Sequence, residues 1–460
     1  MAESVASGQA VTKLSWFRLN NPSVQIILSA ACIALNPGIY LALALLGAGG
    51  GQPSSATMAN IANATAYGVF ALSAPITGSI LNKVGPRIFL VVACTGYPIF
   101  SGSLWYYLEH GHLWFPVVAA VYQGLAGTSL WTSAVYMCNG YAEEHSKAFW
   151  RSVQWIFNML GAAIGASVGL GITWDSIVLG VPKSVYITFV ILQCSIASFG
   201  HVRFRDSIRV MGKLLCEWRT LLLLPVMFSP EFFFPFQANI NAYAFNLRTR
   251  NLNTLLNTLF QFPVTAIHTW IIDRCAKSRR RRLFVGVTVN CVWVTGAYIA
   301  QSIWLNSWDF NWKIPGPEID CTDKAYRGAV VVYLFYAAQY GMFQSLVLYV
   351  LGSFTNDPVK TAAYGGMYTG VLSAGAAVSF GINASLLPFE NVNGEFFAIS
   401  TLCRPILYFV VWKTATETSY GTEEDVIVPV HIRQEMGIGD DVVVHDRSEK
   451  LSNSLKETAV

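Results

Sequence analysis

The feature that most constrains this chain is a series of long apolar runs that recurs along almost its whole length. Hydrophobic residues make up 53% of the 460 residues and charged residues only 12%, where a soluble domain carries roughly 25% charge. A helix needs about 20 mostly apolar residues to cross a bilayer, and it satisfies its backbone hydrogen bonds internally. The sequence therefore predicts an all-α membrane protein with twelve transmembrane helices, at about 24–46, 57–81, 87–107, 114–138, 149–172, 182–203, 220–245, 253–272, 283–304, 328–352, 362–386 and 395–412.

Lysine and arginine are distributed unevenly between the loops that join these runs. With twelve spans both termini lie on one side of the membrane. The N-terminus and loops of that side hold 19 Lys and Arg, whereas the opposite loops hold 6. Cytoplasmic loops carry the excess of cations in membrane proteins, so we expect both termini in the cytoplasm. The plasma membrane and internal membranes both remain open as the location.

The spacing of the runs indicates two halves of the same layout. The seventh run begins about 196 residues after the first, and the pair Asp273–Arg274 follows the pair Asn82–Lys83 by 191 residues. Many transporters consist of two such repeats. The predicted organisation is a cytoplasmic N-terminal segment, a six-helix bundle, a cytoplasmic central loop, a second six-helix bundle and an acidic cytoplasmic tail, at 1–22, 23–203, 204–219, 220–413 and 414–460.

A polar break, GSILNKVGPR at 78–87, separates the second run from the third. It resembles the loop signature G-x-x-x-D-R/K-x-G-R-K/R that joins helices two and three in the major facilitator superfamily. The resemblance implies a fold of two six-helix bundles and a loop that latches them in one conformational state. The implied latch residues are Gly78, Asn82, Lys83, Gly85 and Arg87, with Asp273 and Arg274 in the second half; Asn82 stands where the superfamily has an acid.

Further segments narrow the resemblance to the uncoordinated-type (Unc-like) branch of that superfamily. They are NPGIYLALALLGAGGGQ at 36–52, ANIANATAYGVF at 59–70, GPRIFLVVACTGYPIF at 85–100 and GYAEEHSKAFWRSVQWIFNMLGAAIG at 140–165. The branch includes proteins that look like transporters and others that act as regulatory or chaperone-like partners of channels and receptors. The resemblance therefore implies the fold and the branch, and it leaves the substrate open.

Polar side chains recur on single helix faces inside the predicted spans. Residues three, four or seven positions apart share a face, and a polar group in hydrocarbon is costly and is a candidate for function. One interpretation is a central pathway for a solute; the alternative is hydrogen bonding between helices. The candidates are Asn36 and Tyr40 in the first run, Asn60, Asn63 and Tyr67 in the second, and Gln154 and Asn158 in the fifth.

Two of the predicted spans, the first and the seventh, contain helix-breaking residues next to polar ones. Pro37 and Gly38 are predicted to break the first helix and to free backbone carbonyls for a ligand. Glu231 lies in PVMFSPEFFFPF, between prolines at 225, 230 and 235. This spacing predicts a kinked seventh helix with an acid near the membrane centre, where a single carboxyl group is a candidate for proton coupling. The alternative is a structural role, either paired with Arg404 or reaching towards the interface.

Glycines four positions apart mark two helices for close packing. In membranes such small-residue stripes let helices approach closely. The stripe of the fifth run also resembles the glycine-rich signature of antiporters, but its proline is replaced by Ala166, so the stripe does not predict antiport and close packing is the favoured interpretation. The stripes are Gly161, Gly165 and Gly169 in the fifth run and Gly366 and Gly370 in the eleventh.

Several classes of function find no support in the sequence. It shows no phosphate-binding loop, no spacing typical of a metal site and no catalytic constellation, so neither an enzyme nor a cofactor is expected. The basic run Arg279, Arg280, Arg281 and Arg282 adjoins a span, which favours contact with anionic lipids over nucleic acid. The acidic tail either carries signals for a protein partner or is simply solvated. Asn383-Ala-Ser matches the glycosylation pattern near the end of a span.

Together these features favour a secondary transporter that moves a small solute by alternating access, with Glu231 as a candidate coupling acid. The alternative is a non-transporting membrane regulator, or a chaperone-like partner of a channel or receptor. Neither the solute nor the direction of transport can be read from the sequence.

Overall fold

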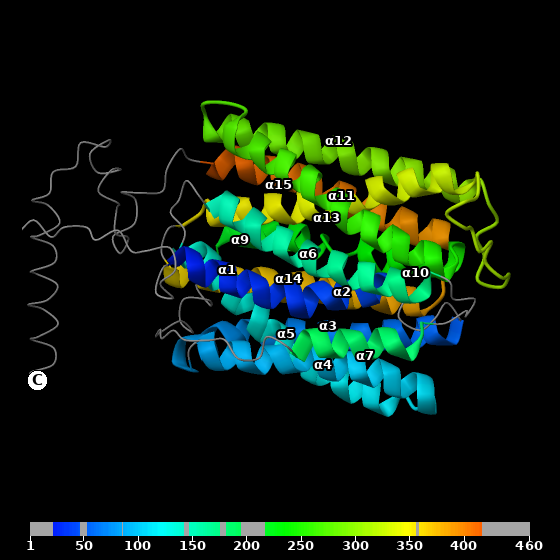
Figure 1. Ribbon diagram of the computed structural model, residues 1–460. Helices are drawn as coiled ribbons and strands as arrows, with labels where there is room; N and C mark the ends of the chain where they lie inside the picture. Colours follow the sequence, from blue (N-terminus) through cyan, green and yellow to red (C-terminus); the bar gives the residue numbers. More distant parts are fainter. Residues whose placement is uncertain are drawn as a thin grey trace, which may run out of the picture.

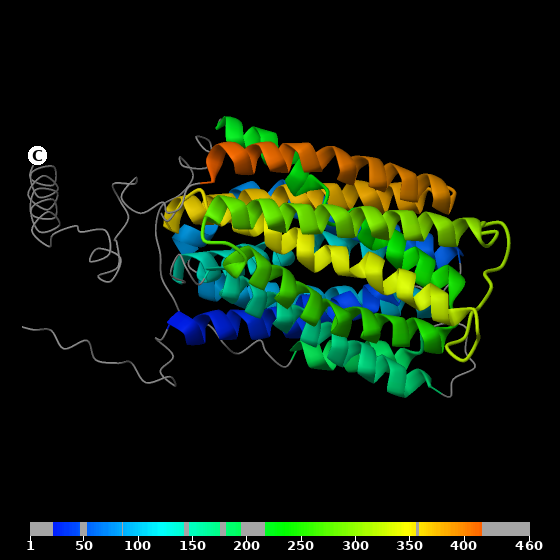
Figure 2. The same ribbon diagram turned by 90° about the horizontal axis from the view of Figure 1, so that it is seen from above.

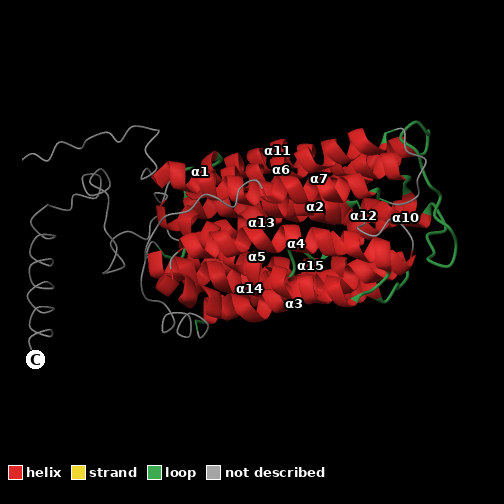
Figure 3. Cartoon of the chain, turned by 60° about the horizontal axis from the view of Figure 1, so that its bottom comes forward, coloured by secondary structure: helices red, strands yellow, loops and turns green. Residues whose placement is uncertain are grey.

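The computed structural model describes residues 22–46, 53–84, 86–141, 147–174, 181–194, 217–355 and 358–415. Within these ranges the fold is a bundle of long helices that run roughly side by side (Figures 1 and 2), without strands (Figure 3). The helices are α1 (Pro22–Ile33), the π-helical turn η1 (Ala34–Gly38), α2 (Ile39–Leu45), α3 (Pro53–Val84), α4 (Pro86–His110), α5 (Trp114–Tyr141), α6 (Lys147–Thr173), α7 (Lys183–Cys194), α9 (Trp218–Phe228), α10 (Phe233–Ala244), α11 (Leu247–Arg274), α12 (Arg279–Asn306), α13 (Tyr326–Gly352), α14 (Pro358–Ala384) and α15 (Phe389–Thr414).

The predicted number of spans is supported only in part. Among the described residues, eight helical stretches are long and apolar enough to cross a membrane. The four other predicted runs correspond to α3, α5 and α14, which have 32, 28 and 27 residues, and to α7, which has 12. Length and composition thus leave the count of twelve a prediction. Most of the predicted segments 1–22, 204–219 and 414–460 lies outside the described residues.

The bundle has two distinct ends. α1 begins and α15 ends at the same end, which we call the terminal end (Figure 1). The segment 307–325, between α12 and α13, lies at the opposite end, which we call the loop end (Figure 1). Helices far apart in sequence pack along the bundle between these ends, above all α3 against α14 and α6 against α11.

The first span does not break at Pro37, as the sequence predicted, but widens into η1. Proline lacks an N–H donor and crowds the preceding turn, and a π turn accommodates the extra space. α6 lies directly against η1. A Cβ atom on Gly161 would lie 1.8 Å from the carbonyl oxygen of Ala34, and one on Gly38 would lie 2.6 Å from that of Asn158. The two backbones can touch only because both positions are glycine.

Three of the remaining glycines of the two stripes are also close to neighbouring helices. Added Cβ atoms on Gly165 and Gly169 would lie 3.0 Å from the Cβ atom of Ala42 and 2.5 Å from Asn251 Oδ1. One on Gly370 of α14 would lie 2.9 Å from the Cβ atom of Ala74 on α3. Gly366 is buried, and its carbonyl oxygen accepts a hydrogen bond from the Thr369 hydroxyl at 3.1 Å.

At the loop end, the segment 307–325 is fastened to the junction of α10 and α11. Ile319 donates its backbone N–H to the carbonyl of Ala244 at 2.9 Å. The carboxylate of Asp320 accepts hydrogen bonds from Asn246 Nδ2 at 2.5 Å and from Arg248 Nη2 at 2.6 Å. Burial raises the pKa of Asp320, but the hydrogen bonds from Asn246, Thr322 and Arg248 outweigh this and hold the pKa below the usual range.

We expect Asp320→Asn to lower thermal stability at neutral pH, by up to about 1 kcal/mol for a partly exposed pair. A depressed carboxyl pKa contributes stability that is present above the unfolded-state value and is lost as the pH falls through the folded-state value. The difference between wild type and Asp320→Asn should therefore shrink steadily below about pH 4. Thermal unfolding of both proteins in detergent at pH 7, 4 and 3 measures this. A difference that stays constant over this range would contradict it.

Candidate functional site: a buried acid in an aromatic cavity

Glu231 lies where the seventh predicted span is interrupted. Residues 229–232 separate α9 from α10, near the middle of the 27-residue stretch Trp218–Ala244. Prolines inside α9 and just before Glu231 weaken the helix here, because proline has no N–H donor. The break is more complete than the predicted kink. It carries the carboxyl group into the middle of the bundle.

α14 supports the interruption from the opposite side. Ser379 Oγ donates a hydrogen bond to the carbonyl oxygen of Phe232 at 2.5 Å. A Cβ atom on Gly375 would lie 1.8 Å from the carbonyl oxygen of Phe228, so this helix also depends on a glycine for its close approach. One backbone carbonyl at the break, that of Phe232, thus finds its partner on α14.

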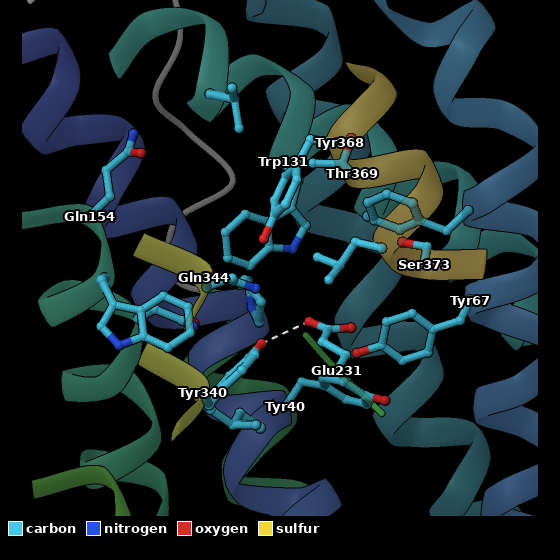
Figure 4. Close-up of a pocket in the computed structure, with 18 of the residues that line it drawn as sticks. Tyr40, Tyr67, Trp131, Gln154, Glu231, Tyr340, Gln344, Tyr368, Thr369 and Ser373 are labelled. Carbon is cyan, nitrogen blue, oxygen red and sulfur yellow. Dashed lines mark hydrogen bonds between the residues drawn. The ribbon is translucent and has the colours of Figure 1, made fainter. Parts of the chain in front are cut away.

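Glu231 opens onto a cavity of about 100 Å³ between the helices. Its wall comes from η1, α2, α3, α4, α5 and α6 on one side and from the α9–α10 break, α13 and α14 on the other. Eight aromatic side chains contribute to this wall, and Figure 4 shows several of them around the carboxyl group. They are Tyr40, Tyr67, Phe70, Tyr97, Trp131, Trp155, Tyr340 and Tyr368.

The carboxyl group of Glu231 has one partner and one free oxygen. Its Oε1 accepts a hydrogen bond from the Tyr340 hydroxyl at 2.8 Å (Figure 4). Oε2 has no hydrogen-bond partner among the described residues, although the residue is only 6% exposed. The proposed pair with Arg404 is not formed, because Arg404 Nη1 donates to Thr295 Oγ1 at 2.5 Å instead. A buried oxygen without a partner is costly and marks the point where a proton or a ligand would be stabilised.

Four of the seven polar candidates from the sequence line this cavity: Tyr40, Tyr67, Gln154 and Asn158. The amide of Gln154 is already engaged, since it donates to the carbonyl of Ala134 at 2.9 Å and accepts from Arg151 Nη1 at 2.8 Å. Asn158 Oδ1 has no partner among the described residues. The spacing of these residues therefore identified helix faces that do converge on one space.

The other three candidates, Asn36, Asn60 and Asn63, are buried beside the cavity without lining it. Asn63 accepts a hydrogen bond from the Tyr40 hydroxyl, and Asn36 donates to the carbonyl of Cys32 at 3.2 Å. Asn60 begins a chain of amides that crosses the bundle, through Asn239 at 3.4 Å to Asn383 at 3.0 Å. These contacts match the alternative interpretation, hydrogen bonding between helices. They also leave Asn383 only 4% exposed, which does not suit glycosylation.

The first half of the latch predicted from the motif falls outside what the structure describes. Gly85 lies outside the described residues, and the side chains of Asn82, Lys83 and Arg87 and the environment of Gly78 are not described either. In the second half, neither Asp273 nor Arg274 forms an ion pair with another described residue.

The arginines that follow are partly engaged within the protein. Arg279 lies over the ring of Tyr349 at 5.7 Å, and Arg280 donates to the carbonyl oxygen of Trp412. Contact with anionic lipids remains a prediction for this run.

The sequence analysis missed the residues that α13 and α14 contribute. Tyr340 and Gln344 lie four positions apart in one apolar run, a signal of the same kind as Gln154 and Asn158. Both line the cavity, as does Tyr368 of α14. Arg151, one of the cations on the side of the termini, also belongs to the wall.

A seam of polar contacts closes the bundle at the loop end. Asn241 of α10 donates to the carbonyl oxygen of Leu45 at the end of α2, at 2.9 Å. Asn251 of α11 donates to Thr173 Oγ1 at the end of α6, also at 2.9 Å. Asn253 joins the seam by donating to Asn241 Oδ1 at 3.0 Å. In contrast, the cavity extends from Glu231 towards the terminal end, because Arg151 near the start of α6 lines it.

Comparison with solved structures shows which fold this arrangement is. The E. coli fucose:proton symporter FucP aligns with a TM-score of 0.56 and 12% sequence identity, over 86% of this chain and 100% of that one. A D-xylose–proton symporter aligns with a TM-score of 0.59 and 14% identity, over 86% and 99%. The titles of two further aligned structures, of FucP and of the proton:xylose symporter XylE, name these proteins as members of the major facilitator superfamily, so the helical bundle has the major facilitator fold.

Sequence comparison identifies the branch. No family model matches the chain. An uncharacterized membrane protein of Schizosaccharomyces pombe is 34% identical over 404 residues, which cover 83% of this chain and 80% of the relative. An UNC93-like protein of the same yeast is 30% identical over 92% of this chain and 86% of the relative. UNC93-like protein 1 of Arabidopsis thaliana is 29% identical over 86% and 91%. The chain is therefore an integral multi-pass membrane protein that belongs to the UNC93-like family and has the major facilitator fold.

Proposed function

We propose that this protein is a secondary active transporter of a small solute, with alternating access between two six-helix halves, 23–203 and 220–413. Twelve spans would place both termini on one side of the membrane, and the excess of Lys and Arg on that side would make it the cytoplasm. The observation that carries the proposal is the cavity in the middle of the bundle. Helices of both proposed halves line it, and the free oxygen of Glu231 has no partner among the described residues. Sites near the midplane, between two repeats, are where secondary transporters bind their solutes.

Glu231 is the proposed proton-coupling residue. Apolar burial disfavours the ionised form of a carboxyl group, so an acid that alternates between a dry cavity and water can take up and release one proton per cycle. The titles of two structural neighbours name proton symporters, which supports the coupling by analogy of fold alone. Among the acids and bases of the described residues, only Glu231 and Arg151 line the cavity as charged groups.

The test is a flux screen on the full-length chain in proteoliposomes that enclose a pH-sensitive dye. A panel of sugars, amino acids, organic cations and organic anions is added outside, with and without an imposed pH gradient. We expect one class of solute to move protons at a rate at least tenfold above protein-free liposomes. If no solute of the panel produces a proton flux, although the protein keeps its helical content and is monodisperse, transport is contradicted. That result would favour the alternative role as a regulator of a channel or receptor.

A further inference from the structure

The cavity combines one unpaired carboxylate oxygen with a wall of aromatic rings, and this combination is selective for charge. A buried carboxylate is stabilised only by a proton or by a positively charged partner. Aromatic faces attract ammonium groups through the electrostatic field of the ring. The described wall supplies both elements within one small space, since Tyr67 and Tyr40 lie beside Glu231 and Tyr340 holds its other oxygen (Figure 4).

Some of the remaining polar groups of the wall are occupied, whereas Gln123 Oε1, Trp155 Nε1, Asn158 Oδ1 and the Tyr368 hydroxyl have no hydrogen-bond partner among the described residues. The Tyr40 hydroxyl donates to Asn63, and the Tyr340 hydroxyl donates to Glu231. Gln154 is engaged with Ala134 and Arg151. Glu231 Oε2 differs from the other atoms without a partner because it is the one carboxylate oxygen among the unpartnered atoms of the described wall, and a small cation needs chiefly this oxygen and the faces of the rings. The space of about 100 Å³ suits a compact ion.

Among the described residues, the groups that line the cavity around Glu231 include one permanent cation, Arg151. The titratable and charged side chains around it in the cavity are Tyr40 of α2, Tyr67 of α3, Tyr97 of α4, Arg151 of α6, Tyr340 of α13 and Tyr368 of α14. Arg151 forms no ion pair with Glu231 and is bound to Gln154 one turn along its own helix. From α15, which packs against α9 and α10, Arg404 is turned to Thr295. The charge of Glu231 is therefore available to a ligand.

From this geometry we infer that the cavity binds a small alkylammonium ion, with Glu231 as the counter-ion and Tyr67, Tyr340 and Trp155 among the rings of its cage. The inference rests on the proposed function and names its class of solute. One carboxyl group holds either a proton or the cation. Binding of the ion to protonated Glu231 releases that proton. The protein would then exchange the ion for a proton across the membrane.

Binding is tested on the purified full-length protein in detergent at pH 8, with choline as the probe. Its neutral isostere, 3,3-dimethyl-1-butanol, and the zwitterion glycine betaine serve as comparisons. We expect choline to raise the melting temperature in a concentration-dependent manner, and the isostere to have no effect. The choline dissociation constant should rise towards tenfold for each unit by which the pH is lowered through the titration of the carboxyl group, because one proton competes for the site.

Variants of Glu231 and Tyr67 separate the contribution of the carboxylate charge from that of the aromatic ring. Glu231→Gln should lose the choline response, while Glu395→Gln, at an exposed position on α15, should keep it. Tyr67→Phe retains the ring and should bind choline within about threefold of wild type. Tyr67→Leu removes the ring and should bind at least fivefold more weakly, the range expected for a cation–π contact. Folding of each variant is checked by its melting temperature without ligand.

The outcomes separate this inference from the proposed function. Equal binding of the isostere, or choline binding that survives in Glu231→Gln, would overturn the cation site. Tighter binding of glycine betaine that is lost in Arg151→Gln would also overturn it and assign a zwitterion instead. If another solute is transported but choline does not bind, the proposed transport function is supported and the cation site is refuted. Choline binding without any flux supports the site and refutes transport.

Discussion

Glu231→Gln is expected to abolish proton-driven transport while leaving the protein folded. Glutamine has nearly the same size and can still accept the hydrogen bond from Tyr340, which joins Oε1 at 2.8 Å in the wild type. It cannot take up or release a proton at this position. In proteoliposomes the proton flux that accompanies the solute should therefore fall to the level of protein-free liposomes at every external pH. Dye fluorescence measures this flux.

Two further variants make the result specific. Glu395→Gln removes an exposed acid from α15 and should transport like wild type. Tyr340→Phe keeps the ring but removes the donor to Glu231, so it should shift the pH dependence without abolishing flux. Proton-coupled flux in Glu231→Gln at the wild-type rate would show that another group carries the proton.

A disulfide across the seam at the loop end should stop transport reversibly. Thr173 on α6 and Asn251 on α11 are joined by a hydrogen bond of 2.9 Å, and they belong to different proposed halves. If these halves must separate at the loop end to admit solute, then Thr173→Cys combined with Asn251→Cys will hold them together after oxidation. We expect flux to fall to background on oxidation and to return with a reductant. Mass spectrometry verifies the cross-link.

The matched control is a cross-link inside one proposed half. Ser101 of α4 and Gln193 of α7 are hydrogen-bonded at 3.0 Å, and Ser101→Cys with Gln193→Cys should cross-link without loss of flux. Each single cysteine variant should be insensitive to oxidation. Full transport by the oxidised seam variant would mean that this end does not open in the cycle.

The sequence was informative wherever the signal lay within one helix. The prolines around Glu231 predicted a disturbed helix with an acid near its middle, and the structure has a break at that place. The four-residue spacing of Gln154 and Asn158 predicted one shared face, and both side chains line the cavity. Local periodicity suffices for such predictions because it fixes which residues share a face.

The sequence was less informative wherever two helices had to be matched. Asn60, Asn63 and Tyr67 share one stripe, yet only Tyr67 reaches the cavity, since Asn60 meets Asn239 on α10. Nothing in the spacing of one helix says which neighbour it will meet. For the same reason Tyr340 and Tyr368 read as ordinary core aromatics until α13 and α14 were placed beside Glu231.

The π turn at Ala34–Gly38 also sets how the side chains of α2 are oriented around the helix axis relative to those of α1. Each residue turns an α-helix by about 100°, and one π turn contains about one residue more than one α turn. Deletion of Leu35 would therefore remove the extra residue and restore a regular helix with nearly the same phase, so that Tyr40 would keep its place in the wall of the cavity. Deletion of a residue from α1, outside the π turn, would instead turn Tyr40 by about 100° relative to the start of α1 and move its ring out of the wall.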